Sequence, residues 1–406
     1  MRLALAPSIL ALALALGLGP ACASRARQSV SLYEAGDFAG AARAADQGLA
    51  AHPGDTGLWQ MRVRAALALG DGDAVARSYG SYRGHRDDDD PELLRDLAIA
   101  TLGQALASPS VKLKIAAIDA VATAELQELA DQVAERMGDD DDRVAAAAAV
   151  AVLRGFPQAP QVASQMLHSE DPEARRIALE GVAKKVGALA LADLEKLAGG
   201  DPDPRVRRAA IRWLGQLKDK EAFELLARQL RHPDEAVRAS AATALARIGI
   251  GDLAAFAHHA LADRALAVRL AAIDLLVAAK RTDELVKLAD DPDPLVAAEA
   301  ATAAHRPELA AKALDRAATS DAWTTRAGAA NIARRAIGKP AALALAHRLL
   351  ADPEVGVRLA AARVLAHAGE RDAAITVFAA LLEPSNDSAL TAAAELASLG
   401  DKRGTK

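Results

Sequence analysis

A repeat of about 31 residues constrains the fold of this chain more than any other feature of its sequence. The clearest copy starts at residue 201 with the letters DPDPRVRRAA. When Val206 of this copy is taken as an anchor, an aliphatic or small residue recurs at spacings of 28 to 32 residues. The anchors are Leu113, Val144, Ala174, Val206, Val237, Val268, Val296, Thr325 and Val357. Nine copies in nearly regular phase predict a solenoid, in which each copy packs mainly against its neighbours.

Each copy has the pattern of two antiparallel helices joined by a turn. In four copies an Asp-Pro pair stands in this turn, where the Asp can cap the second helix and the Pro has no N–H to leave unpaired. These pairs are Asp171-Pro172, Asp201-Pro202, Asp291-Pro292 and Asp352-Pro353. In the second helix, the anchor and the residues three, four and eight positions later form one apolar stripe. The predicted fold is therefore all-α, a right-handed α-α superhelix whose core forms only when the pairs stack.

The repeating unit D-P-x-x-x-V-R-x-A-A-x-x-x-L resembles a HEAT repeat, in the short form shared with bilin-lyase proteins. The resemblance covers residues 92–400, about three quarters of the chain. It implies a fold and not an activity, because one fold carries many functions. It also implies that the second helix of each pair lines the concave surface, where a partner would bind.

Residues 25–88 have a different pattern. The letters LYEAGDF at residues 32–38 resemble the second half of a tetratricopeptide repeat, and Gly36 recurs 34 residues later as Gly70. We therefore expect tetratricopeptide-like helical hairpins before the solenoid. The acidic run from Asp87 to Asp90 is interpreted as a turn that caps the next helix, since it lacks the spaced, Gly-containing loop of an EF-hand calcium site.

Residues 1–24 have the layout of a bacterial export signal: a basic residue, an apolar run and a stretch of small residues. The one Cys of the chain, Cys22, follows the apolar run, which resembles the lipobox of bacterial lipoproteins. The resemblance implies lipid attachment at Cys22, and an outer-membrane lipoprotein facing the periplasm is the predicted location. Ordinary cleavage after Ala23, which would give a periplasmic or secreted protein, is the alternative. The anchor would be the only contact with a membrane.

Composition argues against several kinds of chemistry. A net charge of -5 and an aromatic content of 3% disfavour nucleic-acid binding, and a single Cys excludes a thiolate cluster. None of the nine His is followed by Glu, unlike the repeated His-Glu pairs of the HEAT-repeat enzyme deoxyhypusine hydroxylase, and no nucleotide or hydrolase motif occurs. We therefore expect no cofactor, no metal and no catalysis. A lyase-like or enzyme-associated subunit with an unrecognised site is the alternative, although bilin lyases act in the cytoplasm.

A basic residue follows most anchors and forms a column along the predicted stack. It occurs as Lys114, Arg175, Arg207, Arg238, Arg269, Arg326 and Arg358. We interpret this column as a structural ladder between units. The expected partners are turn carboxylates such as Asp171, Asp203, Asp234 and Asp352.

The residues two and six positions after the anchor lie on one helix face, away from the apolar stripe. On this face Arg176, Arg208 and Arg212 fall within two successive units. They are the predicted contacts for a protein or an acidic peptide on the concave face, because guanidinium groups pair with carboxylates. The predicted function is a non-catalytic protein-interaction scaffold at the bacterial cell envelope. A structural spacer without a specific ligand is a further alternative.

Overall fold

A computed structural model describes residues 20–85, 90–155, 161–382 and 387–405, and these residues form helices and no strand. The chain divides into two compact units, Met1–Met166 and Leu167–Lys406. The predicted all-α superhelix is confirmed, since helices follow one another in packed antiparallel pairs through the repeat region. Among the described helices, none combines the length and the apolar character needed to cross a lipid bilayer.

Unit 1 begins with two helical hairpins that repeat the same turn. Gly36 and Gly70 both have a positive φ, 81° and 70°, which a side chain would disfavour. Each Gly is followed by an Asp, Asp37 or Asp71, that caps the next helix. The helices of the unit are α1 (Pro20–Glu34), α2 (Phe38–Ala51), α3 (Thr56–Leu69), α4 (Gly72–Arg83), α5 (Pro91–Leu106), α6 (Val111–Thr123), α7 (Ala130–Glu135), α8 (Asp142–Gly155) and α9 (Gln161–Ser164). The hairpins fit the expected helix pattern, and their tetratricopeptide assignment stays a prediction.

Two predictions for the N-terminal half concern the export signal and the acidic run. Residues 1–19, with most of the predicted export signal, and Asp87 to Asp89 of the acidic run lie outside the described residues. Cys22 belongs to the first turn of α1. Asp90 caps α5 as predicted, by accepting hydrogen bonds from the N–H groups of Glu92 and Leu93.

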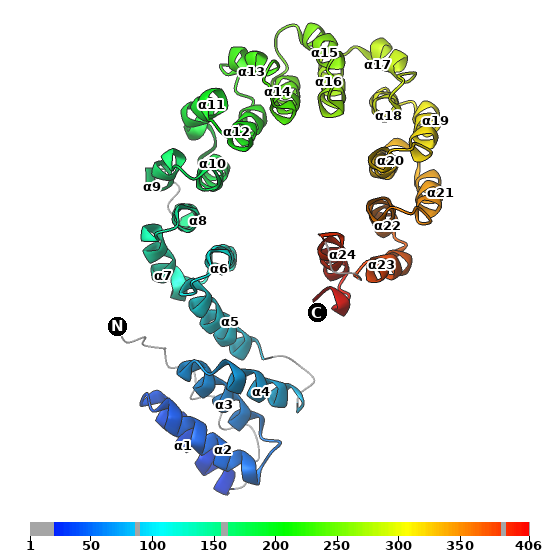
Figure 1. The fold of residues 1–406 in the computed structure, drawn as a ribbon. Coiled ribbons are helices and arrows are strands. Elements are labelled where there is room, and N and C mark those ends of the chain that lie inside the picture. Colours follow the sequence, from blue (N-terminus) through cyan, green and yellow to red (C-terminus); the bar gives the residue numbers. More distant parts are fainter. Residues whose placement is uncertain (1–19, 86–89, 156–160, 383–386, 406) are drawn as a thin grey trace. The chain divides into compact units, whose positions relative to one another are not determined.

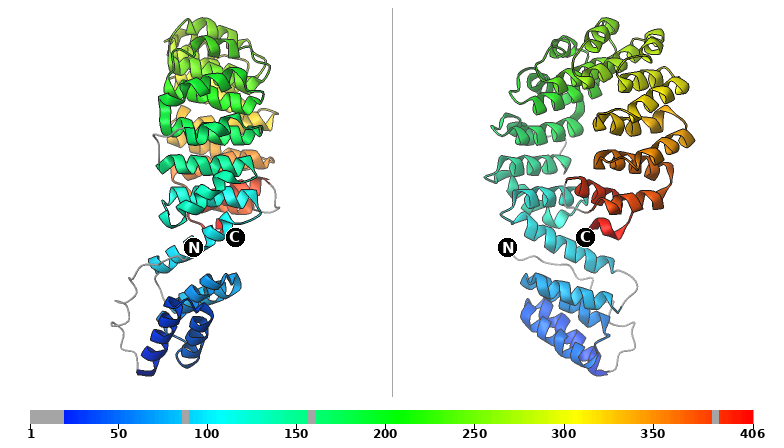
Figure 2. Two further views of the ribbon diagram at one scale, coloured as in Figure 1. Left: turned by 90° about the vertical axis from the view of Figure 1, so that its left-hand side faces the viewer. Right: turned by 45° about the vertical axis from the view of Figure 1, so that its right-hand side comes forward.

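Unit 2 is a curved stack of helix pairs (Figure 1). The second helices of the pairs lie on the inner side of the curve; these inner helices are α10 (Pro172–Val186), α12 (Pro204–Leu217), α14 (Glu235–Ile248), α16 (Leu266–Ala278), α18 (Pro294–Ala303), α20 (Trp323–Ala336), α22 (Val355–Ala368) and α24 (Asp387–Ser398). The outer helices are α11 (Leu191–Gly200), α13 (Phe223–Gln229), α15 (Leu253–Leu261), α17 (Thr282–Leu288), α19 (Pro307–Ala318), α21 (Lys339–Leu349) and α23 (Arg371–Ala380). Figure 2 shows the pairs stacked one on the next in this unit.

The predicted apolar stripe forms the core. Val206, Val237 and Val357 are fully buried anchors, and Leu214, eight residues after its anchor, is also fully buried. Leu113 is the exception, because 53% of its surface is exposed. Its helix, α6, carries the first anchor of the series, so no earlier inner helix covers this position.

The turns before the inner helices correct one prediction. In the DPDP turn of α12, the cap is the second aspartate, Asp203, which accepts from the N–H of Arg205. The first aspartate, Asp201, instead accepts from the N–H of Asp203 at 2.9 Å and closes the turn. The corresponding turn before α18 is built in the same way, with Asp293 as the cap. The carboxylate of the first aspartate in each turn can therefore accept a further hydrogen bond from another donor.

Candidate partner-binding surface

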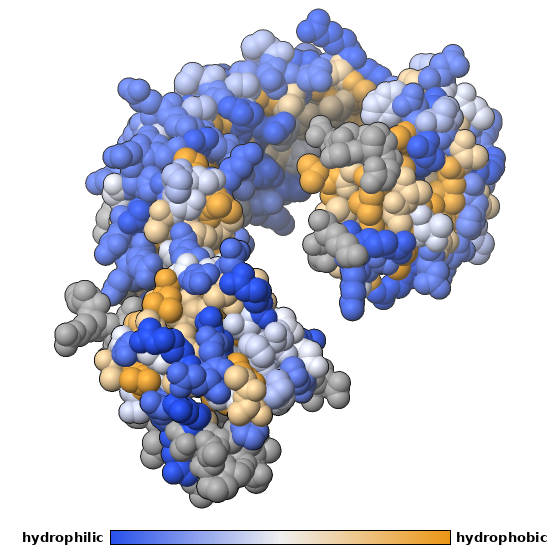
Figure 3. All heavy atoms as spheres, turned by 60° about the horizontal axis from the view of Figure 1, so that its bottom comes forward, coloured by the Kyte–Doolittle hydropathy of each residue, from blue (hydrophilic) through white to orange (hydrophobic). Residues whose placement is uncertain are grey.

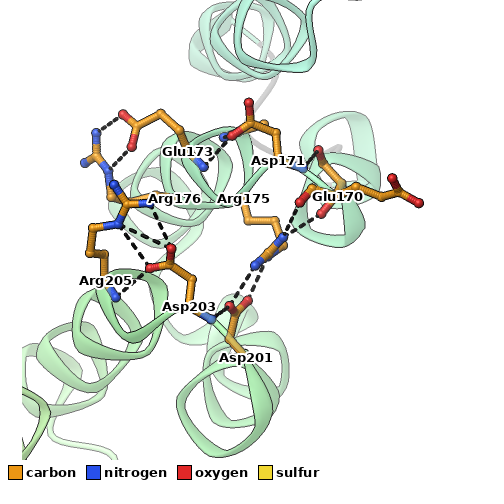
Figure 4. Close-up of polar contacts among 10 residues, drawn as sticks. Glu170, Asp171, Glu173, Arg175, Arg176, Asp201, Asp203 and Arg205 are labelled. Carbon is orange, nitrogen blue, oxygen red and sulfur yellow. Dashed lines mark hydrogen bonds and ion pairs between the residues drawn. The ribbon is translucent and has the colours of Figure 1, made fainter. Parts of the chain in front are cut away.

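The basic residue after the anchor links successive helix pairs of the stack. Arg175 of α10 donates from Nε and Nη2 to the two carboxylate oxygens of Asp201, both at 2.8 Å. Its Nη1 donates to the carbonyl oxygens of Ser169 and Glu170 at 2.8 and 3.1 Å. Only 10% of the Arg175 side chain and 2% of the Asp201 side chain are exposed. One guanidinium therefore joins the turn before its own helix to the turn of the next helix pair (Figure 4).

Equivalent ion pairs form an Arg–Asp ladder, which confirms the structural interpretation of the basic column. The other pairs are Lys114–Asp139 in unit 1 and Arg238–Asp263, Arg269–Asp293 and Arg326–Asp352 in unit 2. Of the four partners expected from the sequence, Asp352 is correct. Asp171, Asp203 and Asp234 cap their own helices, so the partner usually lies two residues earlier in the turn than predicted.

Three positions in the ladder are built differently. Arg269 donates from Nη2 to the capping aspartate Asp293 at 2.7 Å and not to the first aspartate of that turn. The residue after the anchor of α18 is Ala297, and there Arg316 of α19 donates to the carbonyl oxygens of Asp291 and Pro292. These carbonyls occupy the same turn positions as the acceptors of Arg175. Arg207 donates to the carbonyl of Asp201 in its own turn. The next turn carries His232 at the aspartate position, and its Nδ1 accepts from Asp234 at 3.0 Å.

Hydrogen bonds from arginine lower the pKa of two ladder carboxyls, those of Asp263 and Asp352. The guanidinium groups of Arg238 and Arg326 hold the pKa values of Asp263 and Asp352 below the usual range of an aspartate. A lowered pKa in the folded state contributes stability above the ordinary pKa, and this is lost as the pH falls through the folded value. These two pairs are therefore charged at neutral pH, and their groups are engaged within the stack.

The three predicted partner contacts differ in how they are engaged. Arg176 pairs with Glu173 and, at 3.0 Å, with Glu180 on its own helix. Arg212 of α12, in the next helix pair, also pairs with Glu180, at 2.9 Å. Arg208 is exposed, and within the described ranges it has no ion pair. The surface is thus less basic than the sequence suggests, because two carboxylates stand between its arginines.

A groove of about 460 Å³ adjoins Arg212 on the inner side of unit 2. Its lining combines charged and polar side chains with small and aliphatic ones. The lining residues are Arg212, Ala239, Ser240, Thr243, Ala244, Arg247, Ala267, Leu270, Ala271, Ile273, Asp274, Glu299 and Arg335. Of these residues, only Arg212 is among the three contacts predicted from the sequence. The others come from four further helices, and the spacing of the anchors is the signal that could have grouped some of them.

Histidines contribute to the outer surface. His258 Nε2 lies 2.7 Å from a carboxylate oxygen of Glu284, which joins the outer helices α15 and α17. In the parts of the chain that are described, no group of three or more His, Cys, Asp or Glu side chains is placed to hold a metal ion.

A family profile described as HEAT repeats matches residues 159–246 and 190–277. No curated protein matches the chain. Among solved structures, importin beta in a polyethylene glycol condition is 13% identical with a TM-score of 0.38, and the match covers 95% of this chain and 66% of that one. Kap121p bound to Ste12p is 15% identical with a TM-score of 0.31, and the match covers 94% and 48%. The chain thus spans about two thirds and about half of these proteins.

The two overlapping matches to the family profile include α10 to α16, which contain the Arg175–Asp201 and Arg238–Asp263 pairs. The chain therefore contains HEAT repeats, stacked as an α-α superhelix.

Proposed function

We propose that this chain is a non-catalytic scaffold that binds a protein or an acidic peptide at the bacterial cell envelope. The observation that carries the proposal is the inner side of unit 2, where Arg208 is exposed beside two arginines held by carboxylates. Because Glu180 accepts from both Arg176 and Arg212, these guanidinium groups are already ordered before a partner arrives. Preorganised donors lose less conformational entropy on binding.

The rest of the surface favours a partner that is held by polar contacts. Exposed large hydrophobic side chains, such as Leu189 at 76% and Trp323 at 48%, come from different helices. In the face drawn in Figure 3, hydrophilic residues cover much of the surface and hydrophobic residues appear among them. A predominantly hydrophobic partner site is usually a contiguous apolar patch.

The scaffold proposal predicts that charge reversal on the inner face weakens partner capture. The double variant Arg208→Glu with Arg212→Glu should lower capture of envelope proteins by about tenfold or more at low salt, because like charges then face an acidic partner. Capture from detergent-solubilised envelopes, followed by quantitative mass spectrometry, measures this loss. Hydrogen exchange checks that the fold is retained.

The matched control reverses two exposed arginines of an outer helix and its end, Arg228→Glu with Arg231→Glu. It changes the net charge equally and should leave capture intact. Arg207→Ala should lower stability more than capture, because Arg207 binds its own turn. Equal capture by wild type and the inner-face variant would contradict the proposed surface.

The location at the envelope rests on Cys22, and we propose that a lipid is attached there. Native protein should then partition with membranes and carry acyl chains at Cys22, whereas Cys22→Ser should remain soluble or unprocessed. Intact-mass measurement of the mature chain decides between the two cleavage sites. A mature chain that starts at Ser24 without acyl chains would refute lipidation and support simple export.

A further inference from the structure

The groove on the inner side of unit 2 is lined by charged side chains of both signs. Its lining contains three guanidinium groups, those of Arg212, Arg247 and Arg335, and two carboxylates, those of Asp274 and Glu299, which leaves +1 when all are charged. Two of the arginines are engaged, since Arg335 pairs with Glu299 and Arg212 pairs with Glu180 outside the lining. When Glu180 is counted with Arg212, three guanidinium groups face three carboxylates, and Arg247 is the guanidinium of the lining that has no ion pair among the described residues.

Arg247 of α14 is exposed, and among the described residues it has neither an ion pair nor a side-chain hydrogen bond. Asp274 of α16 accepts a hydrogen bond from Thr243 Oγ1 at 3.3 Å. Loss of hydration raises the pKa of Asp274, although Thr243, Arg247 and Arg335 act in the opposite direction.

We propose that this groove binds a carboxylate of an extended peptide, with Arg247 as its principal contact. The proposal rests on the scaffold function and names the ligand class of the inner face. Arg212 and Arg335 are held by their own carboxylates, which leaves Arg247 as the guanidinium of the lining that is open to a further carboxylate. A guanidinium binds a carboxylate through two parallel hydrogen bonds.

The apolar part of the lining suits a peptide better than an isolated anion. Ala239, Ala267 and Ala271 have small side chains, so a main chain can approach the helices closely, and Leu270 offers apolar contact. Ser240 also lines the groove, and among the described residues no hydrogen bond occupies its hydroxyl group, which can donate to a peptide carbonyl. Together these groups can bind the carboxylate and the adjoining main chain.

The test is a titration of the full chain with three short Gly-Ser peptides, followed by methyl NMR at Ile273 in the groove and at Ile337 outside the lining. One peptide is capped at both ends and contains two glutamates, and its matched control contains two glutamines. The third has no acidic side chain but a free C-terminal carboxylate. We expect the Ile273 signal to shift with the glutamate peptide, the free-carboxylate peptide or both, and the Ile337 signal to stay unchanged. The two acidic peptides thus identify the source of the carboxylate.

Variants relate any binding to the groove. Arg247→Glu should weaken the acidic peptides by about tenfold or more. Asp274→Asn should tighten them by about threefold, since it removes a nearby negative charge. Arg228→Glu on the outer helix α13 changes the net charge as Arg247→Glu does and should have no effect. Equal binding of the glutamate and glutamine peptides together with no binding of the free-carboxylate peptide, or equal binding of the acidic peptides by Arg247→Glu and wild type, would overturn the proposal.

The capture experiment separates this proposal from the scaffold function. If peptides fail to bind while capture remains sensitive to Arg208→Glu with Arg212→Glu, the carboxylate groove is refuted and the scaffold stands. If peptides bind through Arg247 while capture ignores every inner-face reversal, the groove stands and the scaffold proposal fails.

Discussion

Replacing Arg175 with Ala is expected to lower the free energy of local opening around α10 and α12 by about 3–5 kcal/mol. The substitution removes a two-pronged ion pair and leaves the Asp201 carboxylate, which is 2% exposed, without its guanidinium. It also removes the donors to the carbonyl oxygens of Ser169 and Glu170. Native-state hydrogen exchange resolves this loss by helix, which a single melting temperature of a repeat protein does not.

The matched control for Arg175→Ala lies on the neighbouring turn. Arg205 pairs with Asp203 at 2.8 Å, but 59% of the Arg205 side chain is exposed and both residues belong to the same turn. Arg205→Ala should therefore leave exchange in α10 and α12 close to that of wild type. Similar effects of the two substitutions on hydrogen exchange would show that the ladder does not couple successive helix pairs.

Replacing Ala210 with Arg is expected to destabilise the stack by about 3–5 kcal/mol, because an unpaired charge is forced into a packed interface. Ala210 is fully buried in α12, which packs against α10, α11 and α14. Since each helix pair depends mainly on its neighbours, the hydrogen exchange rate should rise first in these flanking helices and later in the distant ones.

Ala255→Arg is the control for this substitution. Ala255 is exposed in α15, and the substitution does not change the hydrogen bond that its backbone N–H donates to Asp252. The effect on stability should stay within about 0.5 kcal/mol. If Ala210→Arg instead raised exchange uniformly through unit 2, the unit would be one cooperative core and not a chain of neighbour contacts.

The sequence was sufficient to predict the helices and their core because both follow from short-range periodicity. Val206 and Leu214 are eight residues apart on one helix face, so their burial does not depend on knowing which helix covers them. The role of Asp201 was missed for the opposite reason. Its carboxylate is explained by Arg175, which reaches it only because successive turns lie side by side.

A pairwise signal was nevertheless present in the sequence. Arg175, Arg238 and Arg326 are each followed by an aspartate five residues before the next anchor. Ala297 is followed at that position by Ser320. Comparing copies in pairs would have identified most of the ladder. The groove has no pairwise signature of this kind, because its residues span positions 212 to 335 and meet through the stacking of five helices. The anchor spacing groups only part of it, since Arg212, Thr243 and Asp274 each stand six residues after an anchor.

The ladder also restricts how a chain of this kind can lengthen by gene duplication. A regular copy supplies an arginine to the copy that follows it and an aspartate to the copy before it, as Arg238 and Asp263 do. A duplicated segment is accepted at low cost only where the new junction again places an arginine before an aspartate. Copies such as the one with Ala297, where Arg316 from the following helix supplies the missing donor, must be inherited together with their successor. The unit of duplication there is two repeats and not one.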